Sequence, residues 1–278
     1  CKMETVLPEG ESLISPEDLD TLRFSVRTDG EKGFLFLNNF QDHVQPRPKK
    51  NETVTIELKD TQVIFDHIDL EGEENCILPF GWNMDGILLQ KAGAQMITRI
   101  EKEGQITYVF LKPEGMTPVF TFEEEAITSQ GNHVYKCGKD KPWELFIVEK
   151  GDICLKILCL DRNTSNQMYL LRDQTLLFAR GAVMEEEDRI RLETESAYNK
   201  VMSYPKGAMK ARGSLEKAGE EDEIFDCWTL RTEEKKPQAE IAHTAALKYT
   251  VKVPEDFMEG LKDVLLQIRY KGDIGYAF

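Results

Sequence analysis

The chain has 278 residues, of which 41% are hydrophobic and 31% charged, a composition typical of globular proteins. No run of residues approaches the roughly 20 apolar positions that a membrane-spanning helix needs. With 50 acidic and 35 basic residues the net charge is -15, which argues against nucleic acid as a partner because phosphate binding needs a basic face.

Short strands and turns fill the first part of the chain. Apolar and polar residues alternate from Leu22 to Arg27, which predicts a strand with one buried face, and Asp29-Gly30 is a hairpin signal. Residues 33–37 are apolar on both faces and indicate a central strand. The spacing predicts a β-sandwich over 21–126. Further strands are predicted at 53–58, 62–68, 86–90, 95–101, 106–112 and 119–123.

A second β-sheet region is predicted over 127–205, either separate from the first sandwich or part of it. Its strands are expected at 144–149, 152–160, 168–171, 175–180, 189–194 and 200–204. Residues 206–223 have no aromatic side chain and no alternation, so they are predicted to be a linker.

The last region, 224–278, is again predicted to be β. Strands are expected at 225–230 and 247–253, and residues 263–278 resemble a strand, a Lys271-Gly272-Asp273 turn and the start of another strand. A half-built hairpin at the end of the chain predicts that it is a piece of a longer protein.

Motifs of the common catalytic classes are absent from the sequence, which has no P-loop, dinucleotide fingerprint, zinc-protease helix or nucleophile elbow. The histidines are scattered, without the spacing of metal ligands. We therefore predict no metal and no cofactor. The four histidines are His43, His67, His133 and His243.

The six cysteines form no C-x-x-C pair. Cys154 and Cys159, five positions apart on one predicted strand, would lie on opposite faces and roughly 17 Å apart. Buried free thiols are favoured over a disulfide framework or a zinc site, and the disulfide state stays open.

A carbohydrate-binding surface is one interpretation of two short polar and aromatic segments. Trp82 falls in a segment, 80–86, that is predicted to be turn-like, where its ring could stack on a sugar beside Asn83. The alternative is a packing residue at a sandwich edge. Asn38 and Asn39 follow the central strand and are either ligand contacts or turn formers. Carboxylates are too numerous to single out the pair, about 5 to 10 Å apart, that a glycosidase needs.

Several segments, in order, resemble glycoside hydrolase family 35 β-galactosidases, in the region that follows their catalytic barrel. The resemblance covers most of the chain from residue 20 onward. It rests on Leu22–Gly30, Gly33–Gln41, Ile77–Phe80, Ala94-Gln95, Tyr108–Gly115 and Gly272–Phe278.

This resemblance implies an all-β fold of tandem antiparallel β-sandwiches, the last one a truncated, galactose-binding-like jelly roll over 224–278. It also implies a parent enzyme that is a retaining β-galactosidase with two catalytic glutamates on an N-terminal (β/α)₈ barrel. Residues 1–20 would then be an N-terminal linker from this missing upstream domain. No segment of this chain matches the barrel motifs, so no catalytic residue is carried over.

Three hypotheses follow. The chain is a non-catalytic accessory segment that supports the barrel or shapes the rim of the sugar site, or an independent carbohydrate-binding module for galactosides, or an enzyme that uses carboxylates on sandwich loops. The implied partners are the missing barrel and, through the parent enzyme, galactose-containing glycans. The family implies a periplasmic or secreted location.

Overall fold

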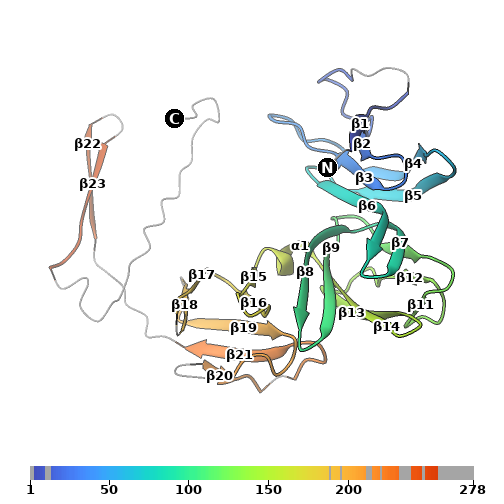
Figure 1. Ribbon diagram of the computed structural model, residues 1–278. Helices are drawn as coiled ribbons and strands as arrows, with labels where there is room; N and C mark the ends of the chain where they lie inside the picture. Colours follow the sequence, from blue (N-terminus) through green and yellow to red (C-terminus); the bar gives the residue numbers. More distant parts are fainter. Residues whose placement is uncertain are drawn as a thin grey trace. The chain divides into compact units, whose positions relative to one another are not determined.

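The computed structural model describes residues 3–9, 14–187, 189–194, 196–210, 215–219, 221–231, 239–245 and 248–255. This part of the chain is nearly all β, as the sequence predicted, with a single short helix, α1 (Arg162–Ser165) (Figure 1). The strands are β1 (Glu4–Val6), β2 (Arg23–Thr28), β3 (Gly33–Asn38), β4 (Lys49–Glu57), β5 (Gln62–Leu70), β6 (Asn75–Met84), β7 (Ile87–Ala92), β8 (Gln95–Lys102), β9 (Gln105–Leu111), β10 (Val119–Phe122), β11 (Ile127–Thr128), β12 (Val134–Lys136), β13 (Trp143–Lys150), β14 (Ile153–Leu160), β15 (Met168–Leu170), β16 (Leu176–Ala179), β17 (Ala182–Glu185), β18 (Ile190–Glu193), β19 (Tyr198–Tyr204), β20 (Leu215–Lys217), β21 (Asp226–Arg231), β22 (Glu240–Ala245) and β23 (Lys248–Lys252).

The chain divides into two compact units. The first contains Cys1–Phe178, Met202–Lys210 and Glu220–Cys227, and the second contains Ala179–Val201, Ala211–Gly219 and Trp228–Phe278.

A seven-stranded sheet, in the order β1-β2-β3-β6-β7-β10-β12, runs through the first unit. Strand β6 changes partner along its length. Its first half, up to Phe80, pairs with β3, and its second half, from Phe80 onward, pairs with β7. The hairpin β4–β5 packs on the β2–β3–β6 part of the sheet (Figure 1). The core between these two layers includes Leu35, Leu37, Val54, Ile56, Phe65, Leu78 and Phe80.

The β7–β10–β12 part of this sheet faces a five-stranded sheet, in the order β11-β13-β14-β9-β8. Within it β9 and β14 are parallel, whereas the other pairs are antiparallel. Both faces of this sheet are buried: Tyr108 and Phe110 face the seven-stranded sheet, and Val109 belongs to a second core with Phe178 and Phe225. Burial on both faces explains why β9 and β14 have apolar side chains at consecutive positions.

Strands from either side of residue 126 share these two sheets, because β10 pairs with β12 and β9 pairs with β14. Residues 127–178 of the second predicted region therefore share the first unit with 21–126, whereas Ala179–Val201 belong to the second unit.

In the second unit β17 pairs with β18, β20 with β21, and β22 with β23. Strand β20 lies inside the segment predicted to be a linker, 206–223, and its Leu215 pairs with Leu230. A three-residue strand has too few residues to show an alternating pattern in the sequence. The final predicted hairpin, 263–278, lies outside the described residues.

No helix in the described ranges is long and apolar enough to cross a bilayer.

Candidate functional site

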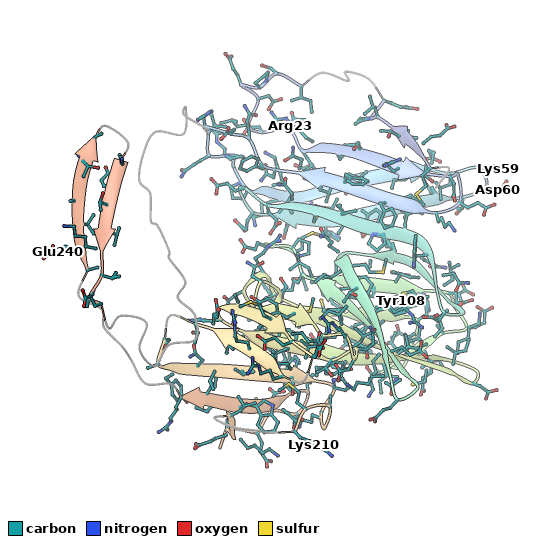
Figure 2. All side chains as sticks on the ribbon, turned by 60° about the vertical axis from the view of Figure 1, so that its left-hand side comes forward. Arg23, Lys59, Asp60, Tyr108, Lys210 and Glu240 are labelled. Atoms are coloured by element: carbon teal, nitrogen blue, oxygen red, sulfur yellow. The ribbon has the colours of Figure 1, made fainter. Side chains whose placement is uncertain are left out.

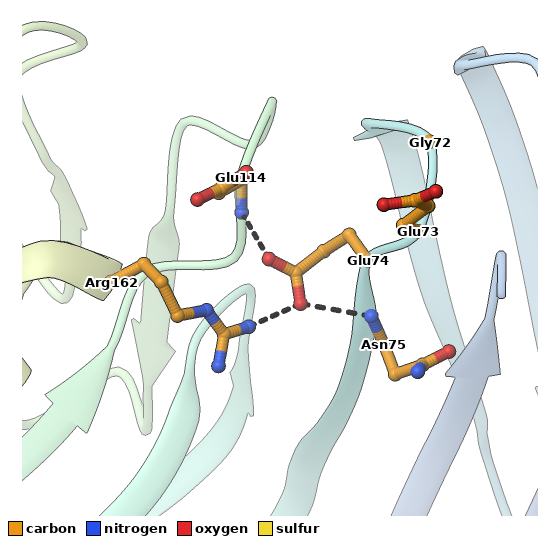
Figure 3. A pocket seen from close by; sticks show the side chains of 6 residues that line it. All are labelled: Gly72, Glu73, Glu74, Asn75, Glu114 and Arg162. Carbon is orange, nitrogen blue, oxygen red and sulfur yellow. Dashed lines mark hydrogen bonds and ion pairs between the residues drawn. The ribbon is translucent and has the colours of Figure 1, made fainter. Parts of the chain in front are cut away.

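A polar hollow of about 360 Å³ lies in the first unit, between the loop before β6, the turn after β9 and helix α1 (Figure 3). Three of its lining side chains are carboxylates, and one is a guanidinium. The lining residues are Gly72, Glu73, Glu74, Asn75, Glu114 and Arg162.

Glu74 is the buried member of the group, with a side chain only 4% exposed. Its Oε1 accepts hydrogen bonds from the backbone N–H of Asn75 at 2.8 Å and from Nη2 of Arg162. Its Oε2 accepts one from the backbone N–H of Glu114 at 3.0 Å (Figure 3). The carboxylate thus fastens three segments that are far apart in the sequence.

Arg162 is placed by the start of α1. Asp161 caps this helix, accepting a hydrogen bond from the backbone N–H of Thr164 at 2.7 Å, the usual role of an N-cap carboxylate. The capped turn directs the guanidinium toward Glu74, and 34% of the Arg162 side chain remains exposed. Partial exposure leaves the rest of the guanidinium open to water or to a polar ligand.

Asn39 supports the loop before β6, whose residues line the hollow. It is 2% exposed, and its amide nitrogen donates to the backbone oxygens of Arg47 at 3.0 Å and Glu71 at 2.8 Å. Its backbone also exchanges hydrogen bonds with Glu73 and Glu74, both 3.0 Å long. Both amide hydrogens of Asn39 are therefore committed to the main chain, which is the behaviour of a turn former.

Asn38, the neighbouring candidate, is exposed, and its Oδ1 accepts a hydrogen bond from the backbone N–H of Phe40 at 2.8 Å. This local bond is an Asx turn. Asn38 lies opposite Asn75, one of the lining residues of the hollow.

Trp82 lies within strand β6, so the prediction of a turn-like segment over 80–86 is wrong for most of its length. The turn consists only of Asp85 and Gly86, whose φ values of 48° and 106° are those of a two-residue hairpin loop. The aromatic and glycine residues upstream obscured the strand, because glycine usually marks a turn. Asn83 is exposed and accepts a hydrogen bond from the backbone N–H of Gly86 at 2.8 Å, so it belongs to this hairpin.

The Trp82 ring is partly exposed and packs beside Phe34, with ring centroids 5.4 Å apart. The Nζ of Lys32 lies 5.9 Å from the ring centroid. Asn38 pairs with Asn75, seven positions along β6 from Trp82, which corresponds to about 23 Å. The four candidate carbohydrate contacts therefore form two separate pairs and not one site.

Sequence reasoning did not single out Glu74, Glu114 or Arg162. Glu74 and Arg162 are separated by 88 positions, and no local pattern connects them. The one usable signal was Asp161 three residues before Thr164, the spacing of a helix N-cap. That spacing predicts the helical turn but not where its arginine points.

A second polar cluster joins the β6–β7 turn to β8 and β9. Arg99 Nε donates to Asp85 Oδ2 at 2.7 Å, and the Tyr108 hydroxyl donates to the same oxygen at 2.8 Å. The hydrogen bond from Arg99 lowers the pKa of Asp85, whereas burial and the bond to Asp85 raise the pKa of Tyr108 to about 12. Tyr108 lies among the packed side chains of the first unit (Figure 2). The cluster fastens one sheet to the other.

Comparison with known proteins found no match: no family model matches the chain, and no curated protein matches it significantly. In the described part of the chain, no group of three or more His, Cys, Asp or Glu side chains is placed to hold a metal ion.

Proposed function

We propose that this chain is a non-catalytic accessory β-sandwich segment of a β-galactosidase-like glycoside hydrolase that acts in the periplasm or outside the cell. The segments that resemble the family support the proposal because they form strands of the sandwich. They include β2 and β3, part of β6, and β9 with the turn that walls the hollow. The resemblance thus falls on the framework of the sandwich.

The observation that carries the proposal is how Glu74 is used. A general acid or base must lie within hydrogen-bond reach of a substrate proton. The oxygens of Glu74 are instead directed at two backbone N–H groups and at Arg162, in a side chain 4% exposed. A carboxylate bound in this way fixes the relative positions of three segments, which is what a supporting module requires.

The partner in this proposal is the catalytic barrel of the parent enzyme, with galactose-containing glycans bound through it. We place the contact with the barrel at an apolar pair on the outer face of the seven-stranded sheet. Phe36 of β3 lies opposite Ile77 of β6 on this face, away from the buried Leu35 and Leu37. Ile77 is 37% exposed and Phe36 is half-buried, so this apolar pair is available to a second domain.

The test uses the longer protein that contains both the barrel and this segment, with Arg162→Met as the variant and Lys50→Ala as the control. Lys50 forms an exposed ion pair with Glu71 near the hollow, 2.8 Å long. The proposal predicts that Arg162→Met shortens the lifetime of galactosidase activity on heating while kcat and KM at low temperature stay unchanged. A large change in kcat or KM without a change in thermal lifetime would show that the hollow takes part in substrate chemistry.

The second candidate function is an independent carbohydrate-binding module for galactosides. The observation in its favour is the partly exposed Trp82 ring beside Phe34 and Asn83, since aromatic faces stack on sugar rings. Calorimetric titration with galactosides would then show binding that Trp82→Ala abolishes. Phe40→Ala, which removes an exposed aromatic ring at the other end of β3, would leave the affinity unchanged. Absence of binding by the unaltered chain would exclude this function.

A further inference from the structure

Two buried cysteines meet between the layers of the first unit. Cys137 follows β12 of the seven-stranded sheet, and Cys159 lies on β14 of the five-stranded sheet. Each is 4% exposed, and both belong to the core that fills the space between these sheets. They are thus residues of opposite layers that share one core.

Glu144 brings the two positions together. It pairs directly with Cys159 across β13 and β14, so both side chains are on the same face of the sheet. Its carboxylate accepts hydrogen bonds from the Tyr135 hydroxyl at 2.7 Å and from the backbone N–H of Gly138 at 2.8 Å. The chain is therefore tied to Glu144 on both sides of Cys137, which fixes this residue beside Cys159.

The neighbouring Cys137 thiol and burial raise the pKa of Cys159 well above its usual value. The other described cysteines differ. Cys76 is equally buried but lies in the core under β4 and β5, Cys154 is exposed, and Cys227 is half-buried against the core that contains Phe178 and Phe225. The meeting of two thiols is specific to the Cys137–Cys159 pair in this core.

We propose that Cys137 and Cys159 form a disulfide that joins the two sheets when the protein folds in an oxidising compartment. The oxidant is a small-molecule disulfide such as oxidised glutathione. One cysteine thiolate attacks it, releasing one glutathione thiol and leaving a mixed disulfide, and the second cysteine displaces the other glutathione. Two S–H groups are lost, one S–S bond forms, and two electrons reduce the oxidant.

The bond forms before the sandwich closes. Thiol–disulfide exchange needs an accessible thiolate, and the folded reduced protein buries both sulfurs and disfavours the thiolate of Cys159. Closing the loop from residue 137 to residue 159 restricts the unfolded chain and raises Tm by about 10 °C. The inference is independent of the proposed function, since any secreted sandwich could use the bond.

The test compares refolding of the denatured, reduced chain in a glutathione redox buffer with incubation of the folded, reduced chain in the same buffer. Peptide mapping after alkylation should find a Cys137–Cys159 link only in the refolded sample, with Cys76 alkylated in both. The refolded wild type should lose about 10 °C of Tm when a reductant is added, as should Cys76→Ala, whereas Cys137→Ala should not respond. Alkylation of both Cys137 and Cys159 after oxidative refolding, or a link from either to another cysteine, would overturn the proposal. Mapping of the wild type decides this even if Cys137→Ala does not fold.

Discussion

Replacement of Arg162 by methionine tests the role of the hollow most quantitatively. The change removes the guanidinium that binds Glu74 and keeps most of the apolar stem. Breaking a buried ion pair costs about 3–5 kcal/mol. Here 34% of the Arg162 side chain is exposed and Glu74 keeps two backbone donors, so water offsets part of the loss. We expect the free energy of unfolding to fall by about 2 kcal/mol, the value of a hydrogen bond to a charged group, and Tm to fall by about 6 °C.

Urea unfolding followed by tryptophan fluorescence measures this loss. Lys50→Ala is the matched control, because it breaks an ion pair whose side chains are 55% and 42% exposed and should cost less than about 0.5 kcal/mol. A double-mutant cycle with Glu74→Gln should give a coupling energy of about 1.5 kcal/mol. If Arg162→Met costs no more than Lys50→Ala and the coupling is near zero, Glu74 does not fasten the three segments.

Two further predictions concern the first unit. The hydrogen bond from Arg99 lowers the pKa of Asp85 below 3.8, so this carboxylate contributes stability above about pH 4 that is lost as the pH falls through the lowered value. Below about pH 4, the unfolding free energy of Asp85→Asn should therefore decrease less with falling pH than that of the wild type. Urea unfolding at a series of pH values measures this, and the same decrease in both proteins would contradict the prediction. Gly81 has φ +64°, and a Cβ there would lie 2.6 Å from the backbone oxygen of Glu31, whereas Gly104 has φ +77° and open space around it. Thermal unfolding should show a cost of about 1 kcal/mol for Gly104→Ala and at least about 1 kcal/mol more for Gly81→Ala; equal losses would refute the steric argument.

Local patterns predicted the strands well where the burial pattern is regular. The alternation in β2 reflects a strand with one buried face, the apolar run in β3 reflects one buried and one half-buried face, and β14 is apolar because cores lie on both of its faces. The second half of β6 was predicted to be a turn because glycine usually marks turns. In the structure Gly81 instead allows the strand to approach the backbone of Glu31 closely.

Long-range pairing could not be predicted from the sequence. The parallel contact of β9 with β14 and the Glu74–Arg162 ion pair both join residues tens of positions apart, and acidic side chains are too common to point to a single partner. Asn39 was predicted to be either a ligand contact or a turn former, and both of its amide hydrogens bind main-chain oxygens. Which side chains meet depends on the register of sheets and not on local composition.

Hydrolysis of a chromogenic β-galactoside by the purified chain, beside the longer protein that includes the barrel, tests the proposed function most directly. The account predicts turnover by the longer protein and none above the buffer rate by this chain. Turnover by the chain alone, lost on replacement of a single glutamate such as Glu73 or Glu114 at the hollow, would contradict it.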